Sequence, residues 1–271
     1  MPLVMTPAAQ QTPQASTPLA SLIPAGMAFT AEGSGGPSAA RARKQAPMVL
    51  PLPSTLGQLL RGGLVLEGLH EGFGCQSEVD LANLRAFALA LASWRFQMAR
   101  GAVVWVQQGP DVQLSLALPA FGLELNRFVS VRTSADRDAL WSAEELCESQ
   151  GVAALLVEVN RFDLLASRRL QLRLEQVAAA NARAKMPPPL LFVLRVPRYG
   201  KKPLDTPSAS STRWRISPSA SLLAQEASEQ DWTWRWRLEL FRNKGGEDRG
   251  IFDLEWCCAT HRFAVVPPLA G

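Results

Sequence analysis

The stretch LVLEGLHEGFGCQS at residues 64–77 decides the fold of this 271-residue chain. Its first half, Leu64–His70, is apolar and predicts a buried strand, and its second half, Glu71–Ser77, reads as a turn with two glycines. Residues 76–100 then carry apolar side chains at helical spacing, which predicts a long and well-buried helix. A strand, a glycine-containing turn and a helix in this order form the local setting of a phosphate-binding P-loop.

The chemistry of a P-loop is nevertheless missing from this turn. A P-loop needs a lysine for the β- and γ-phosphates and a Ser or Thr for magnesium, and the chain has no lysine between Lys44 and Lys185. The two histidines, His70 and His261, belong to no metal-ligand spacing such as HExxH, and no GxSxG motif is present. The sequence therefore predicts a nucleotide-binding scaffold without catalytic residues, cofactor or metal.

Two carboxylates lie near the carboxyl edge of the predicted sheet, where α/β proteins bind ligands. They are Glu67 and Glu158, each in an apolar strand segment. A functional interpretation makes Glu158 a magnesium-associated acid. A structural interpretation makes it a strand-end carboxylate that accepts hydrogen bonds from the backbone. The missing phosphate cradle favours the structural interpretation.

Strands and helices alternate between residues 48 and 197. Beyond the first strand and helix, the patterns predict strands at residues 102–107, 128–132, 152–159 and 190–196, and helices at residues 54–61, 112–121, 134–150 and 162–185. The continuous apolar run Val152–Val159 is typical of a parallel strand that is buried on both faces. The succession predicts an α/β fold with a mostly parallel sheet flanked by helices.

The pattern changes after residue 197, where a polar loop at residues 198–211 is expected. Short segments with period-2 alternation follow, at residues 212–216, 232–242 and 251–258. They predict antiparallel strands added to the edge of the sheet. In the second segment Trp232, Trp234 and Trp236 alternate with Arg235 and Arg237. The tryptophans could stack nucleic-acid bases, but the arginines belong to the opposite face, which favours tryptophans in the core beneath a helix.

The chain thus divides into four expected parts. Residues 1–47 are rich in Pro, Ala, Ser and Gln and are expected to be disordered. Residues 48–197 form the α/β core without a P-loop, residues 198–258 the antiparallel extension, and residues 259–271 a C-terminal tail.

The charge of the chain is uneven. The net charge of +4 combines +2 in residues 1–47, −5 in residues 48–159 and +7 in residues 160–271. A basic C-terminal half suggests an anionic partner, either DNA or an acidic protein surface, and a solvated arginine-rich surface is the alternative. The candidate partner- or DNA-binding residues of this half are Arg213, Arg215, Arg235, Arg237, Arg242, Lys244 and Arg249. Arg168 and Arg169 are further candidates, because cations at a helix start are disfavoured unless a carboxylate or an acidic partner holds them.

The cysteines and the apolar runs bear on the compartment. Cys75, Cys147, Cys257 and Cys258 form no CxxC pair, which argues against a disulfide framework or zinc site and fits a reducing cytoplasm. No apolar run reaches the roughly 18 residues of a membrane span. The N-terminus lacks the pattern of a signal peptide. A cytoplasmic location is therefore expected.

Three segments resemble a known family in the order expected for it. They are FDLLASRRLQL at residues 162–172, TRWRI at residues 212–216 with Pro218-Ser219, and LELFRNKGG at residues 238–246 followed by Leu254-Glu255-Trp256. Together they resemble the inducible mutagenesis protein A family, ImuA, in its alphaproteobacterial form. The resemblance spans residues 50–258.

This resemblance implies a fold related to RecA and to the division inhibitor SulA. It implies an accessory subunit in damage-induced translesion DNA synthesis that binds partners without hydrolysing ATP. The implied partners are ImuB, which is an inactive Y-family polymerase relative, and an error-prone C-family DNA polymerase, with RecA and DNA as further candidates. Two alternatives stay open: a SulA-like inhibitor of the cell-division GTPase, and a RecA-like ATPase with a divergent phosphate cradle.

Overall fold

The computed structural model describes residues 47–74, 78–99, 101–108, 116–183, 186–196, 206–219, 233–244 and 249–266. Three expectations fall largely outside these described residues. They are the disordered segment before residue 47, the first part of the loop at 198–211, and the tip of the last hairpin at 245–248.

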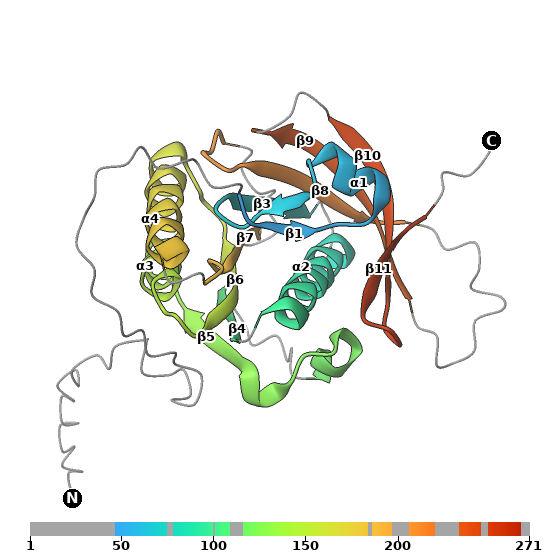
Figure 1. The fold of residues 1–271 in the computed structure, drawn as a ribbon, viewed down its shortest axis with the longest axis horizontal. Coiled ribbons are helices and arrows are strands. Elements are labelled where there is room, and N and C mark those ends of the chain that lie inside the picture. Colours follow the sequence, from blue (N-terminus) through green and yellow to red (C-terminus); the bar gives the residue numbers. More distant parts are fainter. Residues whose placement is uncertain are drawn as a thin grey trace, which may run out of the picture.

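One nine-stranded sheet forms the centre of the fold (Figure 1). In chain order its strands are β3 (Leu69–Gly74), β4 (Ala102–Gln108), β5 (Phe128–Thr133), β6 (Val152–Val159), β7 (Leu190–Arg195), β8 (Thr212–Pro218), β9 (Thr233–Asn243), β10 (Gly250–Cys257) and β11 (Arg262–Val265). Across the sheet the order is β11-β10-β9-β8-β3-β7-β6-β4-β5. The strands from β8 to β5 in this order are parallel, and β8, β9, β10 and β11 pair antiparallel. The predicted α/β fold, with a mostly parallel sheet and added antiparallel strands, is confirmed, whereas a RecA-like arrangement stays a prediction.

Helices cover both faces of the parallel part (Figure 1). Helix α2 (Glu78–Met98) packs on one face, and α3 (Asp136–Cys147) and α4 (Leu164–Arg183) pack on the other. The small elements are the hairpin of β1 (Val49–Pro51) and β2 (Gly63–Val65), helix α1 (Ser54–Leu59), and the 3₁₀ turns η4 (Leu118–Phe121) and η5 (Leu125–Arg127). Among the described residues, no helix is long and apolar enough to cross a membrane.

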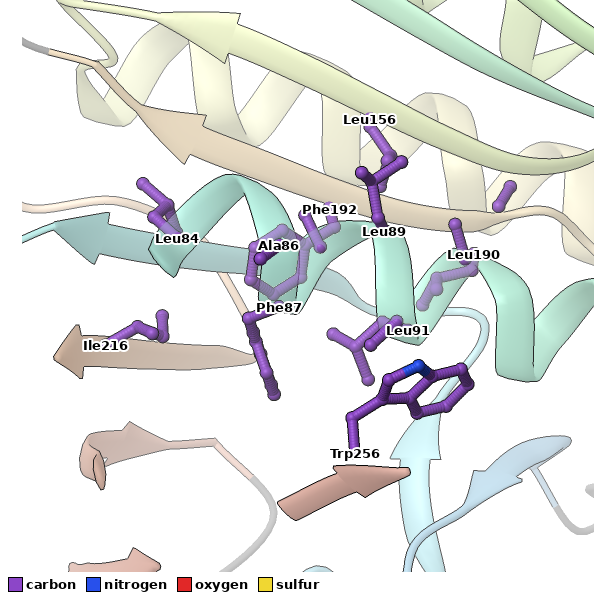
Figure 2. Close-up of a cluster of buried hydrophobic side chains, with 14 of the residues drawn as sticks. Leu84, Ala86, Phe87, Leu89, Leu91, Leu156, Leu190, Phe192, Ile216 and Trp256 are labelled. Atoms are coloured by element: carbon purple, nitrogen blue, oxygen red, sulfur yellow. The ribbon is translucent and has the colours of Figure 1, made fainter. Parts of the chain in front are cut away.

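The larger core lies between α2 and the sheet, and it continues under the antiparallel strands. Figure 2 shows Phe87 and Leu91 of α2 directed toward side chains that include Ile216 of β8 and Trp256 of β10. Phe87 also makes an edge-to-face contact with Trp236, at 5.5 Å between ring centroids. Burying each such side chain contributes about 1.5–3 kcal/mol to stability. Because α2 buries side chains against both parts of the sheet, it holds the parallel and antiparallel strands together.

The position of β6 between two helical layers explains why its sequence is continuously apolar. Ala154 and Leu156 belong to the core under α2, whereas Leu155 and Val157 belong to the second core under α3 and α4. Because both faces are covered, every residue of β6 is buried, as the sequence predicts.

The first strand lies further along the chain than predicted. The apolar pair Leu64-Val65 belongs to the β1–β2 hairpin, and β3 runs from Leu69 through Gly74, including residues expected in a turn. Two polar residues at the predicted boundary between strand and turn are buried and paired: Glu71 binds arginines, and the His70 ring contacts Thr212 Oγ1 at 2.8 Å.

Gly72 serves close packing rather than phosphate binding. It lies within β3, and a Cβ built at Gly72 would approach side-chain atoms of Phe192 and Leu84 to within 2.7 and 2.8 Å. Real Cβ atoms do not come this close, so only glycine lets α2 pack against β3 at this position. Of the predicted turn, only residues 75–77 lie between β3 and α2, and they are outside the described part of the chain.

The C-terminal strands are part of the central sheet, and are therefore joined to the core more closely than the predicted edge extension implies. Strand β8 pairs parallel with β3, from His70↔Thr212 to Gly74↔Ile216, and turns antiparallel only toward β9. The expected tail after residue 258 contains β11, which pairs with β10 and places Phe263 against the rings of Trp236 and Trp256. The folded part therefore continues past the predicted boundary at residue 258, because the buried Phe263 ring extends the core.

Some helix bounds also differ. The segment predicted as a helix at 112–121 contains only the 3₁₀ turn η4 among its described residues, and Gly122 ends it with φ of 65°. Helix α3 begins at Asp136, two residues later than predicted, and Ala135 is its N-cap. Helix α4 begins at Leu164, where the Asp163 carboxylate accepts a hydrogen bond from the Ala166 N–H at 2.8 Å.

Candidate functional site

The carboxylate of Glu158 lies where the sequence suggested a magnesium ligand, and an arginine holds it. Arg85 of α2 donates from Nε to Oε1 at 2.7 Å and from Nη2 to Oε2 at 3.1 Å. The Gln108 N–H adds only a long contact of 3.5 Å. The prediction of a structural carboxylate agrees with this geometry, but its partner is a guanidinium rather than the backbone.

This pairing changes what Glu158 can do. A bidentate arginine engages both carboxylate oxygens, so coordinating a divalent cation through Glu158 would require Arg85 to leave. Among the described residues, no group of three His, Cys, Asp or Glu side chains is placed to hold a metal ion. Glu158 therefore serves in an ion pair between α2 and β6.

A second, fully buried cluster surrounds Glu71 on the opposite face of the sheet. Its carboxylate accepts hydrogen bonds from Arg195 Nη1 at 2.6 Å and from Arg213 Nε at 3.0 Å. The Ser208 and Ser210 hydroxyls donate to it at 2.6 and 3.1 Å. Arg213 was predicted to lie on an outward basic surface, and this placement is wrong: the residue is 7% exposed. The cluster ties β3, β7 and β8 together around one carboxylate.

The other three strand arginines form cross-strand ion pairs. Arg215 pairs with Glu239 at 2.5 Å, Arg235 with Glu255 at 2.5 Å, and Arg237 with Asp253 at 3.0 Å. Each carboxylate lies directly opposite its arginine in the register of β8, β9 and β10. Hydrogen bonds from Arg237 hold the pKa of the Asp253 carboxyl below its ordinary value. The predicted basic face is therefore a neutral ladder of charge pairs.

The tryptophans lie on the other face of these strands, as predicted. Trp214, Trp236 and Trp256 are buried under α2 and the aromatic rings around it, and Trp234 is half-buried. Trp232 lies outside the described residues. The core interpretation is confirmed for the three buried tryptophans, which have no ring face open for a base to stack on.

The remaining C-terminal candidates lie at the β9–β10 hairpin. Arg242 is half-buried and donates to the Ser208 carbonyl at 2.6 Å. Lys244 and Arg249 are exposed on either side of residues 245–248. Arg168 and Arg169 lie on a different element, α4.

The start of α4 carries the last two candidates, and both are exposed. Arg169 Nη2 donates to the Glu144 carboxylate of α3 at 2.8 Å, so a carboxylate of a neighbouring helix offsets the unfavourable charge at the helix start. A surface cleft of about 540 Å³ opens beside this pair. Its lining residues are Arg137, Asp138, Leu140, Trp141, Glu144, Arg161, Asp163, Ala166 and Arg169. We name it the α3–α4 cleft.

Sequence reasoning missed Trp141, an exposed tryptophan that lines this cleft. Its side chain is 53% exposed although tryptophan is usually well buried. A signal was present in the sequence: Trp141 falls at helical spacing from Arg137, Glu144 and Glu145, on the polar side of α3, rather than with the buried Ala139, Ala143 and Leu146.

Comparison with known proteins gives the family. No protein-family model matches the chain. Protein ImuA of Caulobacter vibrioides, in each of two strains, is 35% identical over 226 residues, which cover 80% of this chain and 88% of that protein. The chain belongs to the ImuA family. The resemblance inferred from the three sequence segments is thereby confirmed.

Membership of the ImuA family directs attention to what this fold leaves exposed. The arginine-rich strands are neutralised within the chain, and Glu158 is engaged by Arg85. The α3–α4 cleft instead combines an exposed aromatic ring with arginines, a combination enriched at protein interfaces.

Proposed function

We propose that this ImuA-family protein acts in damage-induced mutagenesis as a non-catalytic accessory subunit of a translesion DNA synthesis complex. The observation that carries the non-catalytic part is the Arg85–Glu158 pair at the carboxyl edge of the sheet. Breaking a buried ion pair by removing one partner costs about 3–5 kcal/mol. Binding magnesium through Glu158 would break this pair and cost a similar free energy. The segment before α2 has no P-loop lysine whose phosphate contacts could offset that cost.

The partners of this role are proteins. An ImuB-like inactive Y-family polymerase relative and an error-prone C-family DNA polymerase are the proposed partners, with RecA as a third. The charge ladder supports protein contacts over DNA contacts, because Arg215, Arg235 and Arg237 already have carboxylate partners and offer little free positive charge to phosphates.

The test of the accessory role is complementation of a strain whose own copy of the gene is deleted. The wild-type chain is expected to restore damage-induced mutation. A double variant, Arg85→Leu with Glu158→Leu, removes both charges and is expected to fold, because a buried pair can be replaced by apolar residues of similar volume. It should restore mutation as well, since the pair performs no chemistry in this proposal.

Two results would contradict the proposal. A folded double variant that loses mutagenesis, together with magnesium-dependent ATP hydrolysis by the wild type, would favour the divergent ATPase. Affinity capture that yields the cell-division GTPase and neither polymerase partner would favour the SulA-like alternative. Glu158→Leu alone is the matched control, because it leaves the Arg85 guanidinium without its carboxylate and should reduce stability.

A further inference from the structure

The α3–α4 cleft is held in shape by hydrogen bonds at the start of both helices. Asp136 at the first turn of α3 accepts from the Asn160 N–H at 2.9 Å and from the Arg161 N–H at 3.0 Å. Its Oδ1 also accepts from the Gln108 side chain at 2.9 Å. Asp163 then caps α4. The loop between β6 and α4 is thus fixed to α3, and the backbone that carries Arg161 is positioned before any partner binds.

Exposed apolar side chains lie in this cleft and on the adjoining helix. Trp141 is 53% exposed within the cleft. Leu165 and Leu172 are 73% and 40% exposed and lie two turns apart on α4, so they form one outward stripe. Of the exposed large apolar residues in the described parts of the chain, these three and Leu164 gather on α3 and α4. Such a grouping marks an interaction surface more often than a solvated one.

The charges around the cleft indicate the chemistry of the partner. Arg169 and Arg137 each have a carboxylate within ion-pair distance in the chain. The side chains of Arg161, which lines the cleft, and of Arg168, which precedes the lining residue Arg169 in α4, have none among the described residues, although both are exposed. They leave positive charge that a carboxylate of a partner can neutralise.

The same charges disfavour nucleic acid. Three carboxylates, Asp138, Glu144 and Asp163, line the cleft together with three arginines, so the cleft is not strongly positive. Surfaces that bind DNA are much more positively charged than protein interfaces. An exposed tryptophan beside leucines and arginines matches the anchors of a protein interface instead.

We propose that the α3–α4 cleft binds an acidic segment of a partner protein, which inserts an aliphatic or aromatic side chain beside Trp141 and places carboxylates against Arg161 and Arg168. The inference deepens the proposed accessory role by naming the surface and the chemistry of the segment that meets it. The leucine stripe of α4 extends the contact beyond the cleft.

The binding test uses the full chain and a displayed library of random peptides. Peptides that combine carboxylates with Leu, Phe or Trp are expected to be enriched, and resynthesised peptides are titrated by calorimetry. Trp141→Ala should weaken their binding about 30-fold, the effect of losing an interface anchor worth about 2 kcal/mol. Arg161→Glu should weaken it about tenfold or more, because a repulsive charge then faces the peptide carboxylates.

Matched controls are taken from exposed residues that do not line the cleft. Leu125→Ala truncates another exposed apolar residue, and Arg262→Glu reverses an exposed arginine of β11. Both should bind the peptides like the wild type. The proposal is overturned if no acidic peptides are enriched, or if the cleft variants bind as tightly as the controls. It is also overturned if a labelled single-stranded oligonucleotide binds and Arg161→Glu abolishes that binding.

A cellular measurement separates this inference from the proposed function. The wild type, Trp141→Ala and Leu125→Ala are each placed in the deletion strain, and damage-induced mutation is measured at equal protein abundance. A wild type that fails to restore mutation refutes the accessory role itself. If the wild type and a folded Trp141→Ala both restore full mutation, the docking surface alone is refuted. Loss in Trp141→Ala with retention in Leu125→Ala supports both.

Discussion

Replacing Glu71 with glutamine should destabilise this protein more than any other single loss of charge among the described residues. The carboxylate is fully buried and accepts hydrogen bonds from two arginines, of which Arg195 is also fully buried. Glutamine keeps the shape but leaves two guanidiniums without a counter-charge. Removing one partner of a buried ion pair costs about 3–5 kcal/mol, against a total stability of about 5–15 kcal/mol for a native domain.

The measurement is urea unfolding followed by tryptophan fluorescence, supported by calorimetry. In calorimetry, a loss of 3–5 kcal/mol should lower the thermal unfolding midpoint by roughly 6–20 °C, at about 2–4 °C per kcal/mol for a domain of this size. Glu239→Gln is the matched control, because Glu239 also pairs with an arginine but its side chain is 40% exposed. Exposed pairs are worth about 0–1 kcal/mol.

A double-mutant cycle then tests the cause. The variant Glu71→Gln with Arg195→Met should lose less stability than the two single losses combined, because the second substitution removes a charge that the first leaves unpaired. The reasoning is refuted if Glu71→Gln costs no more than Glu239→Gln, or if the double loss is fully additive.

Three further predictions follow from buried and exposed positions. Burial lowers the pKa of His70 to about 4 in the folded protein. As the pH falls, the unfolded chain therefore protonates this histidine before the folded protein does. The free energy of unfolding should fall for this reason between about pH 6.5 and pH 4. An NMR titration of the His70 ring with a midpoint above 6 would contradict this. Gly72→Ala should cost about 1–3 kcal/mol in urea unfolding, because its methyl group would overlap the Phe192 ring; a neutral result would show that the ring can move. Trp236→Ala should cost about 3–5 kcal/mol, whereas Trp141→Ala should leave the unfolding midpoint nearly unchanged, and equal losses would refute the exposure assigned to Trp141.

The sequence predicts well the features that depend on one segment at a time. The apolar run of β6 indicates a strand buried on both faces, and the alternation of Trp236 with Arg235 and Arg237 indicates two opposite faces of β9. Both follow from the period of side chains along a strand, and both are confirmed.

Features that depend on two distant segments escape this reasoning. Nothing in the sequence near Arg215 shows that Glu239 lies opposite it, because the register between strands sets that pairing. Glu71 resembles a turn residue until its buried partners on β7 and β8 are known. The α3–α4 cleft likewise requires the packing of two helices, although the tryptophan on the polar side of α3 was a usable signal.

The position of β8 beside β3 has a consequence during synthesis of the chain. Both sheet neighbours of β3 come much later in the sequence, and 142 residues separate His70 from its hydrogen-bonding partner Thr212. At about 5–20 residues per second, a ribosome takes roughly 7–28 s to bridge that interval. Until β7 has been synthesised, β3 has two unpaired edges, and the carboxylate of Glu71 has neither of its arginines. Nascent chains of this family are therefore expected to depend on chaperones before the last third of the protein emerges.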